Sequence, residues 1–567
     1  MLNHSVLFAR PVRQPAAKRK LGERHQRCRR GRQHLMGVVM KFMGVVMKSR
    51  SRLICVGTGM LILAASATIA QMIDNTQAPN VAGAGIHKSL TDEIGTGRGD
   101  KNTPDSSVFI INRDPFRSVR RGRQLFQRKF TRLQGQGAGV GDGSGDINTT
   151  IGIGAGLVDS CAGCHARPRG SAGFGGDVVT RPDSRSAPHL FGLGLKEMLA
   201  DEITSDLRAI RDQAIASAKG HKMVTLPLTS KGIDFGLVTV DRFGSVDTSQ
   251  VQGVDPDLRI RPFFAHGGTI SIREFIVGAL NAEMGLQAST DPDLIAAAIQ
   301  KKRVVTPSGM VLDGSRDKIE APPPADALTN ANEIDPAIVD HLEFYLLNYF
   351  KPGTGQQTTS AQHGLAVFNQ IGCASCHIQN LPINQDRRVA DVETAYDAVN
   401  GIFNNLFATA TTLLHSVDDK SGFPPLKLPN LQPFLVKNIF TDFKRHDLGT
   451  NFYERNWDGT LQQLFLTRPL WGLGTVAPYG HDGRSISVPD VILRHGGEAQ
   501  TSRDTFAALS DLDREDLLNF LDSLILFPPD DTASNLDSGN RSALNFPQFG
   551  HGSIKVTVLF NDPTDLE

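Results

Sequence analysis

The sequence predicts a mainly α-helical fold built from two similar halves. One observation is a pair of Cys-x-x-Cys-His motifs, at residues 161–165 and 373–377. A second is the frame around them: a helical segment with a Gly-x-x-x-Phe pattern precedes each motif, a Gly-Leu-Gly segment follows it, and an amphipathic helix stopped by proline closes each half. A third is the scarcity of strand signals, of which Ile554–Phe560 is the clearest. Together they indicate an internal duplication.

The Cys-x-x-Cys-His motif is typical of covalent c-type haem attachment. The two sulfurs add across the haem vinyl groups, and the adjacent histidine becomes the first axial ligand of the iron. A lone Cys-x-x-Cys also occurs in zinc sites and in thioredoxin-like dithiols, but the following histidine favours haem, and no further ligand pair follows at zinc spacing. The sequence therefore predicts two covalently bound haem c groups, held by Cys161, Cys164 and His165, and by Cys373, Cys376 and His377. Nothing in it supports a bound calcium ion.

Each half is expected to begin and end with a helix. The helices before the motifs are expected over Val119–Leu133 and Ala361–Gln370, with Gly122/Phe126 and Gly364/Phe368 as the shared pattern. The first closing helix is expected from Pro336 to Phe350, and the second after Ser510, which can cap with Asp513. Their apolar stripes read as core: Ile338, Leu342, Tyr345, Leu346 and Tyr349, then Leu517, Leu518, Leu521, Leu524 and Ile525.

These elements predict two cytochrome c-like haem domains with long loops and insertions. The first carries a Gly-rich insertion, 135–156, before its cysteines, and the repeated segments are Pro188–Gly194 and Pro469–Gly474. Residues 351–360 read as the linker between the halves. The predicted divisions are a basic leader with signal peptide (1–70), an N-terminal haem domain (71–352), a C-terminal haem domain (361–529) and a tail (530–567).

The N-terminal region reads as a secretory signal. Lys48, Arg50 and Arg52 form its basic part, Leu53–Leu63 its apolar part, and small residues at 65–70 offer cleavage sites. The apolar run is too short to span a bilayer comfortably, so a membrane location is expected only if the signal stays uncleaved. Residues 36–41 repeat at 43–48, and we expect the true start at Met43 or Met47. Because c-type haem is attached outside the cytoplasm, a periplasmic location is expected.

The net charge of the exported part is acidic. The whole chain has a formal charge of +1, but 14 of its 60 basic residues and a single acid lie within the first 70 residues. The remainder has 46 basic and 58 acidic residues, a net charge of −12. This composition argues against nucleic acid as a partner. It suits a basic, diffusible redox donor as well as it suits a solubilising surface.

Six further segments carry a resemblance to a known family: Arg185–Leu195, Asn281–Gly285, His446–Gly449, Pro469–Gly474, His481–Arg484 and His495–Ala499. In their order around the two motifs they resemble the bacterial di-haem cytochrome c peroxidase superfamily, most closely its di-haem oxidoreductase branch. The resemblance spans roughly residues 110–527 and is more specific in the second half. Members of this branch are often labelled thiol oxidoreductases, but the exported part has no cysteine pair outside the two motifs.

The resemblance implies how the second haem is ligated. In the peroxidases its distal ligand stands fourteen residues after the histidine of the His-Asp-Gly motif, and from His481 that position is His495. The peroxidases commonly have methionine there, and the methylamine-utilisation branch has tyrosine. The second haem is therefore expected to be a bis-histidine centre, His377/His495, with a lower potential than methionine would give. The alternatives are His446 as the ligand, and a His495 that only hydrogen-bonds a propionate or a carbonyl. His481 is expected to order its loop by hydrogen bonds.

The first haem is expected to be more open. Related peroxidases often have a histidine about sixteen residues beyond the motif, but Val179–Asp183 contains none here, and the next, His189, falls in the Gly-Leu-Gly segment. The iron bound to His165 is thus expected to be five-coordinate or water-bound. His266 and Met284 are the alternative sixth ligands.

A carboxylate is expected near the first haem, because peroxide cleavage needs a group that moves a proton from the inner to the outer oxygen. Glu283, followed by Met284, resembles the glutamate–methionine pair of the peroxidases; the alternative is an ordinary acid at a helix end. Two positions depart from the family pattern. Arg273 stands where the peroxidases have glutamine, and 262–266 lacks their tryptophan between the haems. The chain has tryptophan only at Trp457 and Trp471.

The sequence thus predicts an exported di-haem enzyme. Electrons from a small cytochrome or cupredoxin enter at the second haem and pass to the first, where peroxide or a related small oxidant is reduced with Glu283 handling protons. One alternative is a non-catalytic electron-transfer cytochrome with both irons six-coordinate. Another is an oxygenase or oxidase that uses the open haem on a different substrate.

Overall fold

The computed structural model describes residues 90–130, 158–168, 170–178, 185–220, 222–324, 334–396, 406–456, 458–526 and 553–555. By its contacts the chain divides into residues 1–67 and 68–567, and all described residues belong to the second unit. The predicted leader, the Gly-rich insertion, Trp457, residues 179–183 and most of the tail lie outside the described residues. The predicted haem-domain boundaries therefore stay a prediction.

The described helices include the four that the sequence predicts, before and after each motif, and several that it does not predict. They are α1 (Leu90–Ile94), α2 (Ser107–Arg113), α3 (Pro115–Gln127), α4 (Leu193–Ala218), α5 (Ile272–Met284), α6 (Pro292–Leu294), α7 (Pro336–Asn348), α8 (Thr359–Gln370), α9 (Val488–Arg494), α10 (Gln500–Ala507) and α11 (Asp511–Asp522). Short helical turns add η2 (Cys161–Gly163), η3 (Ile295–Ile299), η4 (Cys373–Ser375) and η5 (Gly497–Ala499). Ser510 caps α11 as expected, accepting a hydrogen bond from the Asp513 N–H at 3.1 Å.

The prediction of a mainly α fold is wrong. Helices hold 35% and strands 19% of the described residues, so the protein is a mixed α and β structure. Its strands are β1 (Asp177–Val178), β2 (Arg185–Ser186), β3 (Val224–Ser230), β4 (Ile233–Val240), β5 (Val246–Asp247), β6 (Arg303–Val305), β7 (Val311–Asp313), β8 (Lys351–Thr354), β9 (Leu381–Ile383), β10 (Ala390–Tyr396), β11 (Leu406–Thr412), β12 (Leu414–Val417), β13 (Leu426–Pro429), β14 (Phe434–Val436), β15 (Arg445–Asp447), β16 (Glu454–Arg455), β17 (Leu461–Gln462), β18 (Leu464–Leu466), β19 (Leu524–Ile525) and β20 (Ser553–Lys555).

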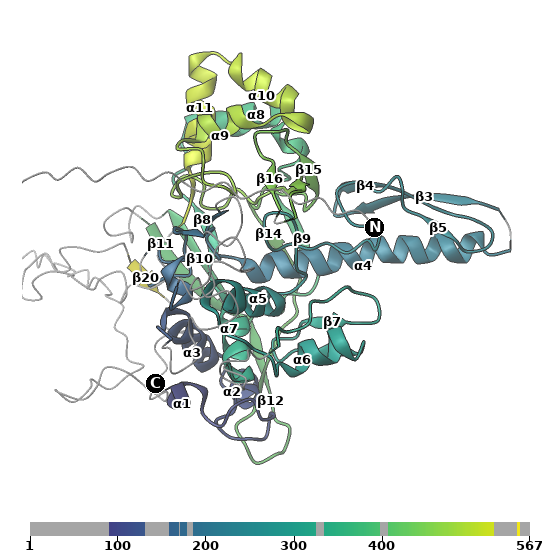
Figure 1. The fold of residues 1–567 in the computed structure, drawn as a ribbon. Coiled ribbons are helices and arrows are strands. Elements are labelled where there is room, and N and C mark those ends of the chain that lie inside the picture. Colours follow the sequence, from purple (N-terminus) through teal and green to yellow (C-terminus); the bar gives the residue numbers. More distant parts are fainter. Residues whose placement is uncertain are drawn as a thin grey trace, which may run out of the picture. The chain divides into compact units, whose positions relative to one another are not determined.

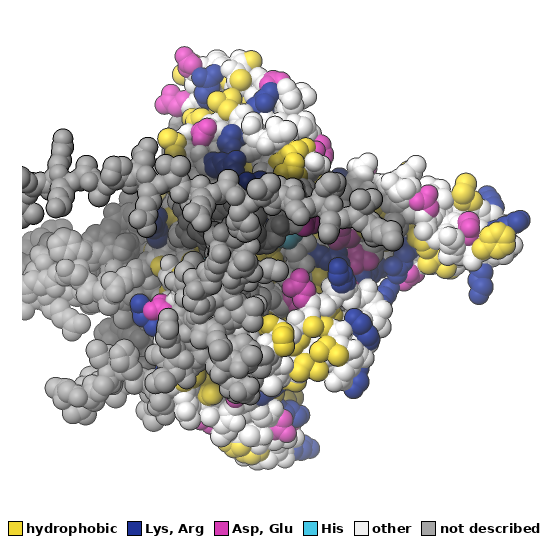
Figure 2. Space-filling view, in the orientation of Figure 1, with side chains coloured by type: hydrophobic (Ala, Val, Ile, Leu, Met, Phe, Trp, Pro, Cys, Tyr) yellow, Lys and Arg dark blue, Asp and Glu magenta, His cyan; other side chains and the backbone are white. Residues whose placement is uncertain are grey.

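Most strands lie in insertions that the two-helix frame does not predict. An antiparallel sheet of β3, β4 and β5 follows α4, whose first half packs in the core and whose second half accompanies β3 and β4 as an arm (Figure 1). Met223 and Phe243 are exposed, and Arg242 lies over the Phe243 ring. Figure 2 shows hydrophobic and basic side chains together at the outer end of this arm. Between the second motif and Val436, β10 pairs with β11, β12 with β13 and β9 with β14, each pair antiparallel.

The predicted linker is also not wholly a loop. Its first residues form β8, which lies inside a five-stranded sheet of order β19-β8-β10-β11-β20. Leu524 and Ile525, expected on the closing helix, form β19 in that sheet and pair with β8. The last residues of the expected linker begin α8, capped by Thr358.

The two halves repeat one helix packing. In the first, α3 packs on α7; in the second, α8 packs on α11. Both crossings need glycine, since a Cβ at Gly122 would collide with the His341 carbonyl and one at Gly364 with the Asp516 carbonyl. One turn later, Phe126 contacts Tyr345 and Phe368 contacts Phe520, with ring centroids 5.9 and 5.6 Å apart. The predicted Gly-x-x-x-Phe pattern thus sets the same contact twice.

The two Gly-Leu-Gly segments also share their geometry. The first glycine of each is left-handed, with φ 73° at Gly192 and 72° at Gly472, a conformation that favours glycine. The second glycine of each lies against its own half's closing element, where a Cβ would meet the carbonyl of Leu347 or of Asp522. The segments therefore run close past the end of each closing helix, and the predicted duplication is confirmed in these contacts.

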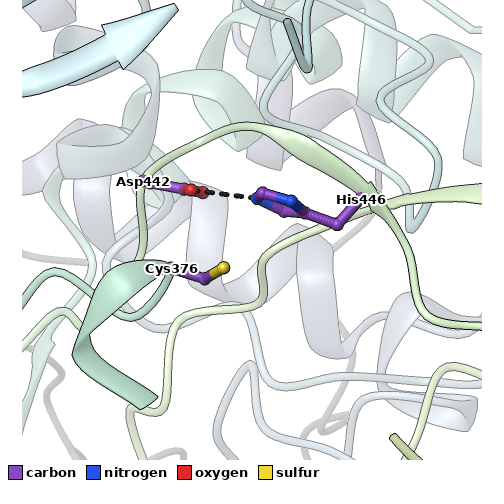
Figure 3. A group of neighbouring side chains, drawn as sticks. All are labelled: Cys376, Asp442 and His446. Atoms are coloured by element: carbon purple, nitrogen blue, oxygen red, sulfur yellow. Dashed lines mark hydrogen bonds and ion pairs between the residues drawn. The ribbon is translucent and has the colours of Figure 1, made fainter. Parts of the chain in front are cut away.

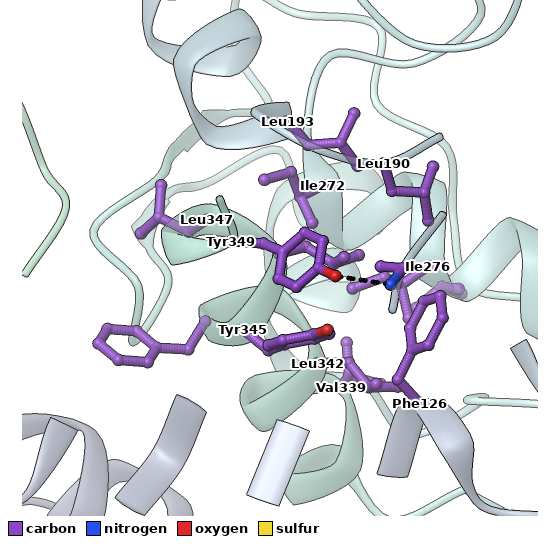
Figure 4. Close-up of a cluster of buried hydrophobic side chains, with 14 of the residues drawn as sticks. Phe126, Leu190, Leu193, Ile272, Ile276, Val339, Leu342, Tyr345, Leu347 and Tyr349 are labelled. Atoms are coloured by element: carbon purple, nitrogen blue, oxygen red, sulfur yellow. Dashed lines mark hydrogen bonds between the residues drawn. The ribbon is translucent and has the colours of Figure 1, made fainter. Parts of the chain in front are cut away.

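Buried apolar side chains anchor the frame. The largest cluster joins α3, α5 and α7, and Tyr345 and Tyr349 lie at its centre with the first predicted stripe (Figure 4). The Tyr349 hydroxyl accepts a hydrogen bond from the Ala172 N–H at 2.9 Å, just beyond the first motif. A second cluster joins α4 to β3 and β4, and a third joins α8 to α11. Within the described part of the chain, no helix is both long and apolar enough to cross a membrane.

Candidate functional site

Both Cys-x-x-Cys-His motifs line one cavity of about 880 Å³. Its wall includes Cys161, Cys164, His165, Cys373, Cys376, His377 and His495. Glu283, Met284, His266, His189, His446 and His481 also line it. The structure therefore gathers the predicted site residues of both halves around a single space.

The first motif presents one imidazole nitrogen to the cavity. Cys161 begins the turn η2, and His165 follows it with its Nδ1 2.7 Å from the Pro188 carbonyl oxygen. Nδ1–H therefore donates to that carbonyl, which leaves Nε2 deprotonated. Burial lowers the pKa of His165, so the ring is neutral at pH 7. A hydrogen bond from the ring nitrogen that does not bind the metal commonly orients a metal-binding histidine.

The second motif repeats this arrangement. Cys373 begins η4, and His377 Nδ1 lies 2.9 Å from the Phe440 carbonyl oxygen. Burial lowers the pKa of His377 to about 4, so this imidazole is also neutral. The repeated frame extends to the aromatic neighbours: Phe126 lies 6.3 Å from His165, and Phe368 lies 6.2 Å from His377, between ring centroids.

The cysteines do not resemble a reactive dithiol. Burial raises the pKa of Cys161 to about 12 and that of Cys373 to about 11. Thioredoxin-like cysteines are activated by a lowered pKa. The thioredoxin-like alternative is therefore disfavoured at both motifs.

His495 lies across the second site at the end of α9. Its Nδ1 is 2.7 Å from the Val491 carbonyl oxygen, so Nδ1–H donates there and Nε2 is left deprotonated. Burial lowers the pKa of His495. A positive charge on His495 would lower the pKa of His377. The two imidazoles are thus near enough to interact electrostatically. The geometry suits the predicted ligand role, which stays a prediction.

His446, the alternative ligand, has both nitrogens engaged. Nδ1 lies 2.8 Å from Glu498 Oε2, and Nε2 lies 3.0 Å from Asp442 Oδ2 (Figure 3). Although burial opposes it, the hydrogen bond to Asp442 and further acceptors raise the pKa of His446 to about 11. The ring is therefore a cation with no lone pair for a metal.

Cys376, Asp442 and His446 also form a cluster with metal-ligand atoms within 4.8 Å of one another. In such a cluster the imidazole would have to give up a proton that two carboxylates hold. The sulfur of Cys376 is moreover predicted to bind haem. The cluster is therefore a hydrogen-bonded wall of the second site rather than a separate metal centre.

Two residues hold the His-Asp-Gly loop. The ring of His481 stacks on Phe465 at 4.2 Å between centroids, its Nε2 lies 3.8 Å from Glu454, and its carbonyl oxygen accepts a hydrogen bond from the Ser186 N–H at 3.0 Å. Asp482 also anchors the loop, because it forms an ion pair with Arg494 at 2.7 Å, one residue before His495. This pair ties the loop to the end of α9.

Glu283 and Met284 lie at the cavity end of α5. Ser271 caps the start of this helix, and Gly285 ends it with a left-handed φ of 71°. Burial raises the pKa of Cys164 to about 11, and the negative charge of Glu283 adds to this rise. The Glu283 carboxylate therefore lies near the first motif. Met284 is buried, and His266 stacks on Phe264 at 6.3 Å between centroids. Glu283, Met284 and His266 all line the cavity, and the distal role of Glu283 stays a prediction.

Arg273 does not substitute for a distal glutamine. It lies at the start of α5 and is fully buried away from the cavity wall. Its guanidinium forms ion pairs with Asp291 at 2.6 Å, Glu343 at 2.8 Å and Asp340 at 2.9 Å. Arg273 therefore joins three chain segments in the core of the first half.

Comparison with protein families places the second half. Residues 379–524 match the family described as "Di-haem oxidoreductase, putative peroxidase". The predicted resemblance to the di-haem oxidoreductases is confirmed. The match begins just after His377 and ends at β19, so it includes His446, His481 and His495, and the first half lies outside it. It supports an oxidoreductase role with haem as the cofactor.

Other comparisons add little. No curated protein matches the chain. Among solved structures, Kuenenia stuttgartiensis hydrazine synthase, pressurized with 20 bar xenon, covers 79% of this chain and 98% of its own at 12% identity, with a TM-score of 0.31.

The residues at both motifs fit the cofactor that the name of the matched family implies. Each motif offers two sulfurs and a neutral imidazole whose Nδ1–H is held by a carbonyl, which leaves Nε2 for iron. The cavity wall is largely aromatic and aliphatic, as expected for a macrocycle. The buried indole Nε1 of Trp471 lines this cavity without a hydrogen-bond acceptor among the described residues.

Three residues of the wall were not predicted from the sequence. Lys196 on α4, Arg468 before the second Gly-Leu-Gly segment, and Trp471 within it all line the cavity. The only signal was position: Arg468 directly precedes Pro469, Trp471 lies two residues after Pro469, and Lys196 lies two residues after Gly194. Nothing in residue type alone distinguishes a cavity lysine from a surface lysine.

Proposed function

We propose that this protein is an exported di-haem c-type cytochrome oxidoreductase that reduces peroxide or a related small oxidant. The proposal includes covalent attachment of both haems, through Cys161 and Cys164 and through Cys373 and Cys376. It places electron entry at a bis-histidine second site, His377/His495, and reduction of the oxidant at the first.

One observation carries the proposal: the two motifs share one cavity but have unlike surroundings. The second motif faces His495, a neutral imidazole with its Nδ1–H already held. The first has Glu283 nearby. A pair of neutral imidazoles favours electron transfer, whereas a carboxylate beside an open position favours proton-coupled chemistry.

When bound, haem would supply the electron storage and the iron that binds the oxidant. The protein's own groups would do the rest. His165 and His377 fix their rings through the carbonyls of Pro188 and Phe440, and His495 would complete the second site. Reduction of hydrogen peroxide to two waters takes two electrons and two protons. The carboxylate of Glu283 would move a proton from the inner to the outer peroxide oxygen.

A periplasmic location follows from the predicted signal peptide and from haem attachment outside the cytoplasm. The net charge of −12 beyond residue 70 suits a basic electron donor, such as a small cytochrome or a cupredoxin, because opposite charges speed association. The location and the donor are part of the proposal.

Substitution of Glu283 tests the catalytic part. In the haem-loaded, half-reduced protein, Glu283→Gln should lower kcat for peroxide reduction by about 10²–10⁴-fold, the usual contribution of a positioned acid–base group. Glu515→Gln, an exposed acid on α11, is the control and should leave kcat unchanged. Stopped-flow loss of peroxide measures both.

Two outcomes would change the proposal. Unaltered turnover in Glu283→Gln would remove this residue from the mechanism. A wild-type protein that exchanges electrons through both haems but leaves peroxide untouched in every redox state would favour the electron-transfer cytochrome instead.

A further inference from the structure

Two cationic side chains line the cavity without an anionic partner. Lys196 places its Nζ 5.5 Å from the centre of the Phe263 ring, and Arg468 Nη1 contacts the Gly480 carbonyl oxygen at 3.4 Å. Among the described residues, no carboxylate lies within 4 Å of either cation. Elsewhere in the core, buried arginines such as Arg273 and Arg388 each have at least two acidic partners.

The protein alone leaves these charges poorly stabilised. Burial lowers the pKa of Lys196 to about 7, and the nearby charge of Arg468 adds to the effect. Burial likewise lowers the pKa of Arg468 to about 10, with Arg185 adding to it. An uncompensated buried charge is costly unless a counter-charge is supplied. An anion from outside the described residues would therefore stabilise Lys196 and Arg468.

A buried donor lies in the same part of the wall. Trp471 is 4% exposed, and its Nε1–H has no acceptor among the described residues. Its carbonyl oxygen accepts a hydrogen bond from His189 Nε2–H at 2.8 Å, and its ring packs against Gly192. The charges of Lys196 and Arg468 both act on His189. The two cations and the indole thus meet where the two Gly-Leu-Gly segments touch.

We propose that Lys196, Arg468 and Trp471 form a carboxylate-binding site that holds haem propionates at the junction of the two halves. The inference rests on the proposed haem binding. The Lys196 ammonium, the Arg468 guanidinium and the Trp471 indole N–H can all donate hydrogen bonds to carboxylate oxygens. Hydrogen bonds from charged donors to carboxylates are stronger than those between neutral groups. Each haem brings two carboxylates into this cavity by its own attachment. Because Lys196 comes from one half and Arg468 and Trp471 from the other, the site forms only when both halves meet.

Such a site would tune reduction potentials. A cation near a haem favours the reduced state, since reduction lowers the positive charge of the iron centre. Lys196→Met and Arg468→Met should each lower the midpoint potential of at least one haem. We expect the reduced-to-oxidised equilibrium to fall at least tenfold, which is 59 mV for one electron. Lys437→Met, at an exposed position, is the control and should leave both potentials unchanged.

Two further variants separate charge from folding. Arg468→Lys keeps the charge and should restore most of the potential. Trp471→Phe keeps all charges but removes the donor, and should shift the propionate bending bands in the resonance Raman spectrum while the haem content by pyridine haemochrome stays at two. These readouts do not depend on turnover.

A free carboxylate is the other source of the missing anion. If it fills the site, adding acetate should shift the wild-type potentials, and Arg468→Met should abolish that shift; this outcome overturns the propionate assignment. Haem-loaded variants with unchanged potentials and Raman bands overturn the inference alone. A wild-type protein without bound haem would refute the proposed function first.

Discussion

The histidines around the cavity differ in what their two nitrogens bind. His165, His377 and His495 each donate a hydrogen bond from Nδ1–H to a backbone carbonyl, which leaves Nε2 available to bind iron. His446 gives both nitrogens to carboxylates and is held as a cation. The chemistry of an imidazole is thus set by its acceptors more than by its distance from a cysteine.

This difference separates the two candidates for the distal ligand of the second haem. His495→Ala should remove one axial ligand, so the low-spin ferric signal of that haem should give way to a high-spin one in EPR. His446→Gln loses a cation but no ligand, and should keep the low-spin signal. The reverse result in the two variants would assign the ligand to His446.

The sequence predicts those residues of the site that lie close together along the chain. The three residues that each motif contributes lie within five consecutive positions, so their roles follow from spacing. Lys196, Arg468 and Trp471 escaped prediction because their roles depend on burial and on the meeting of distant segments. The ion pair of Asp482 with Arg494, which helps to hold the loop of His481, was missed for the same reason.

The helices before and after each motif cross at a glycine. In both halves that glycine lets the carbonyl of the closing helix lie against the first helix, so the phenylalanine one turn later reaches its aromatic neighbour. The crossing fixes the frame from which the motif turn and its histidine extend. The Gly-x-x-x-Phe pattern is therefore a packing signal rather than a ligand-binding one.

Gly364→Ala should destabilise the second half. The new Cβ would collide with the Asp516 carbonyl, and overpacking of this kind costs about 1–3 kcal/mol. Gln362→Ala, an exposed position on the same helix, is the matched control and should change stability little. Thermal unfolding of the haem-loaded proteins measures both. An unchanged unfolding temperature in Gly364→Ala would show that the helices separate at low cost.

The strands show where element prediction fails. β3 and β4 alternate buried and exposed residues around a turn at Lys231 and Gly232, which have φ values of 50° and 82°. That alternation is visible in the sequence and could have been found. β8 could not, because Lys351–Thr354 contains proline and glycine and is a strand only through its neighbours β10 and β19.

The whole molecule brings a duplicated helical frame and unrelated insertions together. The frame was predictable, since each copy carries its own glycine, phenylalanine and Gly-Leu-Gly segment. The fold class was not, because residues 196–260 and 378–440 hold strands that no repeat announces. A fold class inferred from repeated elements ignores what lies between them.

The shared cavity gives the two motifs unequal partners. The second has His495 and the cationic His446 beside it, and the first has Glu283. The two Gly-Leu-Gly segments meet between the motifs through His189 and Trp471. We therefore propose that the two haems divide the work within one cavity, with electron entry at the second haem and reduction of the oxidant at the first.

The spin state of both ferric haems tests that claim most directly. EPR of the purified protein, with two covalent haems verified by pyridine haemochrome, should show one low-spin bis-histidine centre and one high-spin centre that responds to added peroxide. Two low-spin centres that stay inert to peroxide in both the oxidised and the half-reduced protein would contradict it.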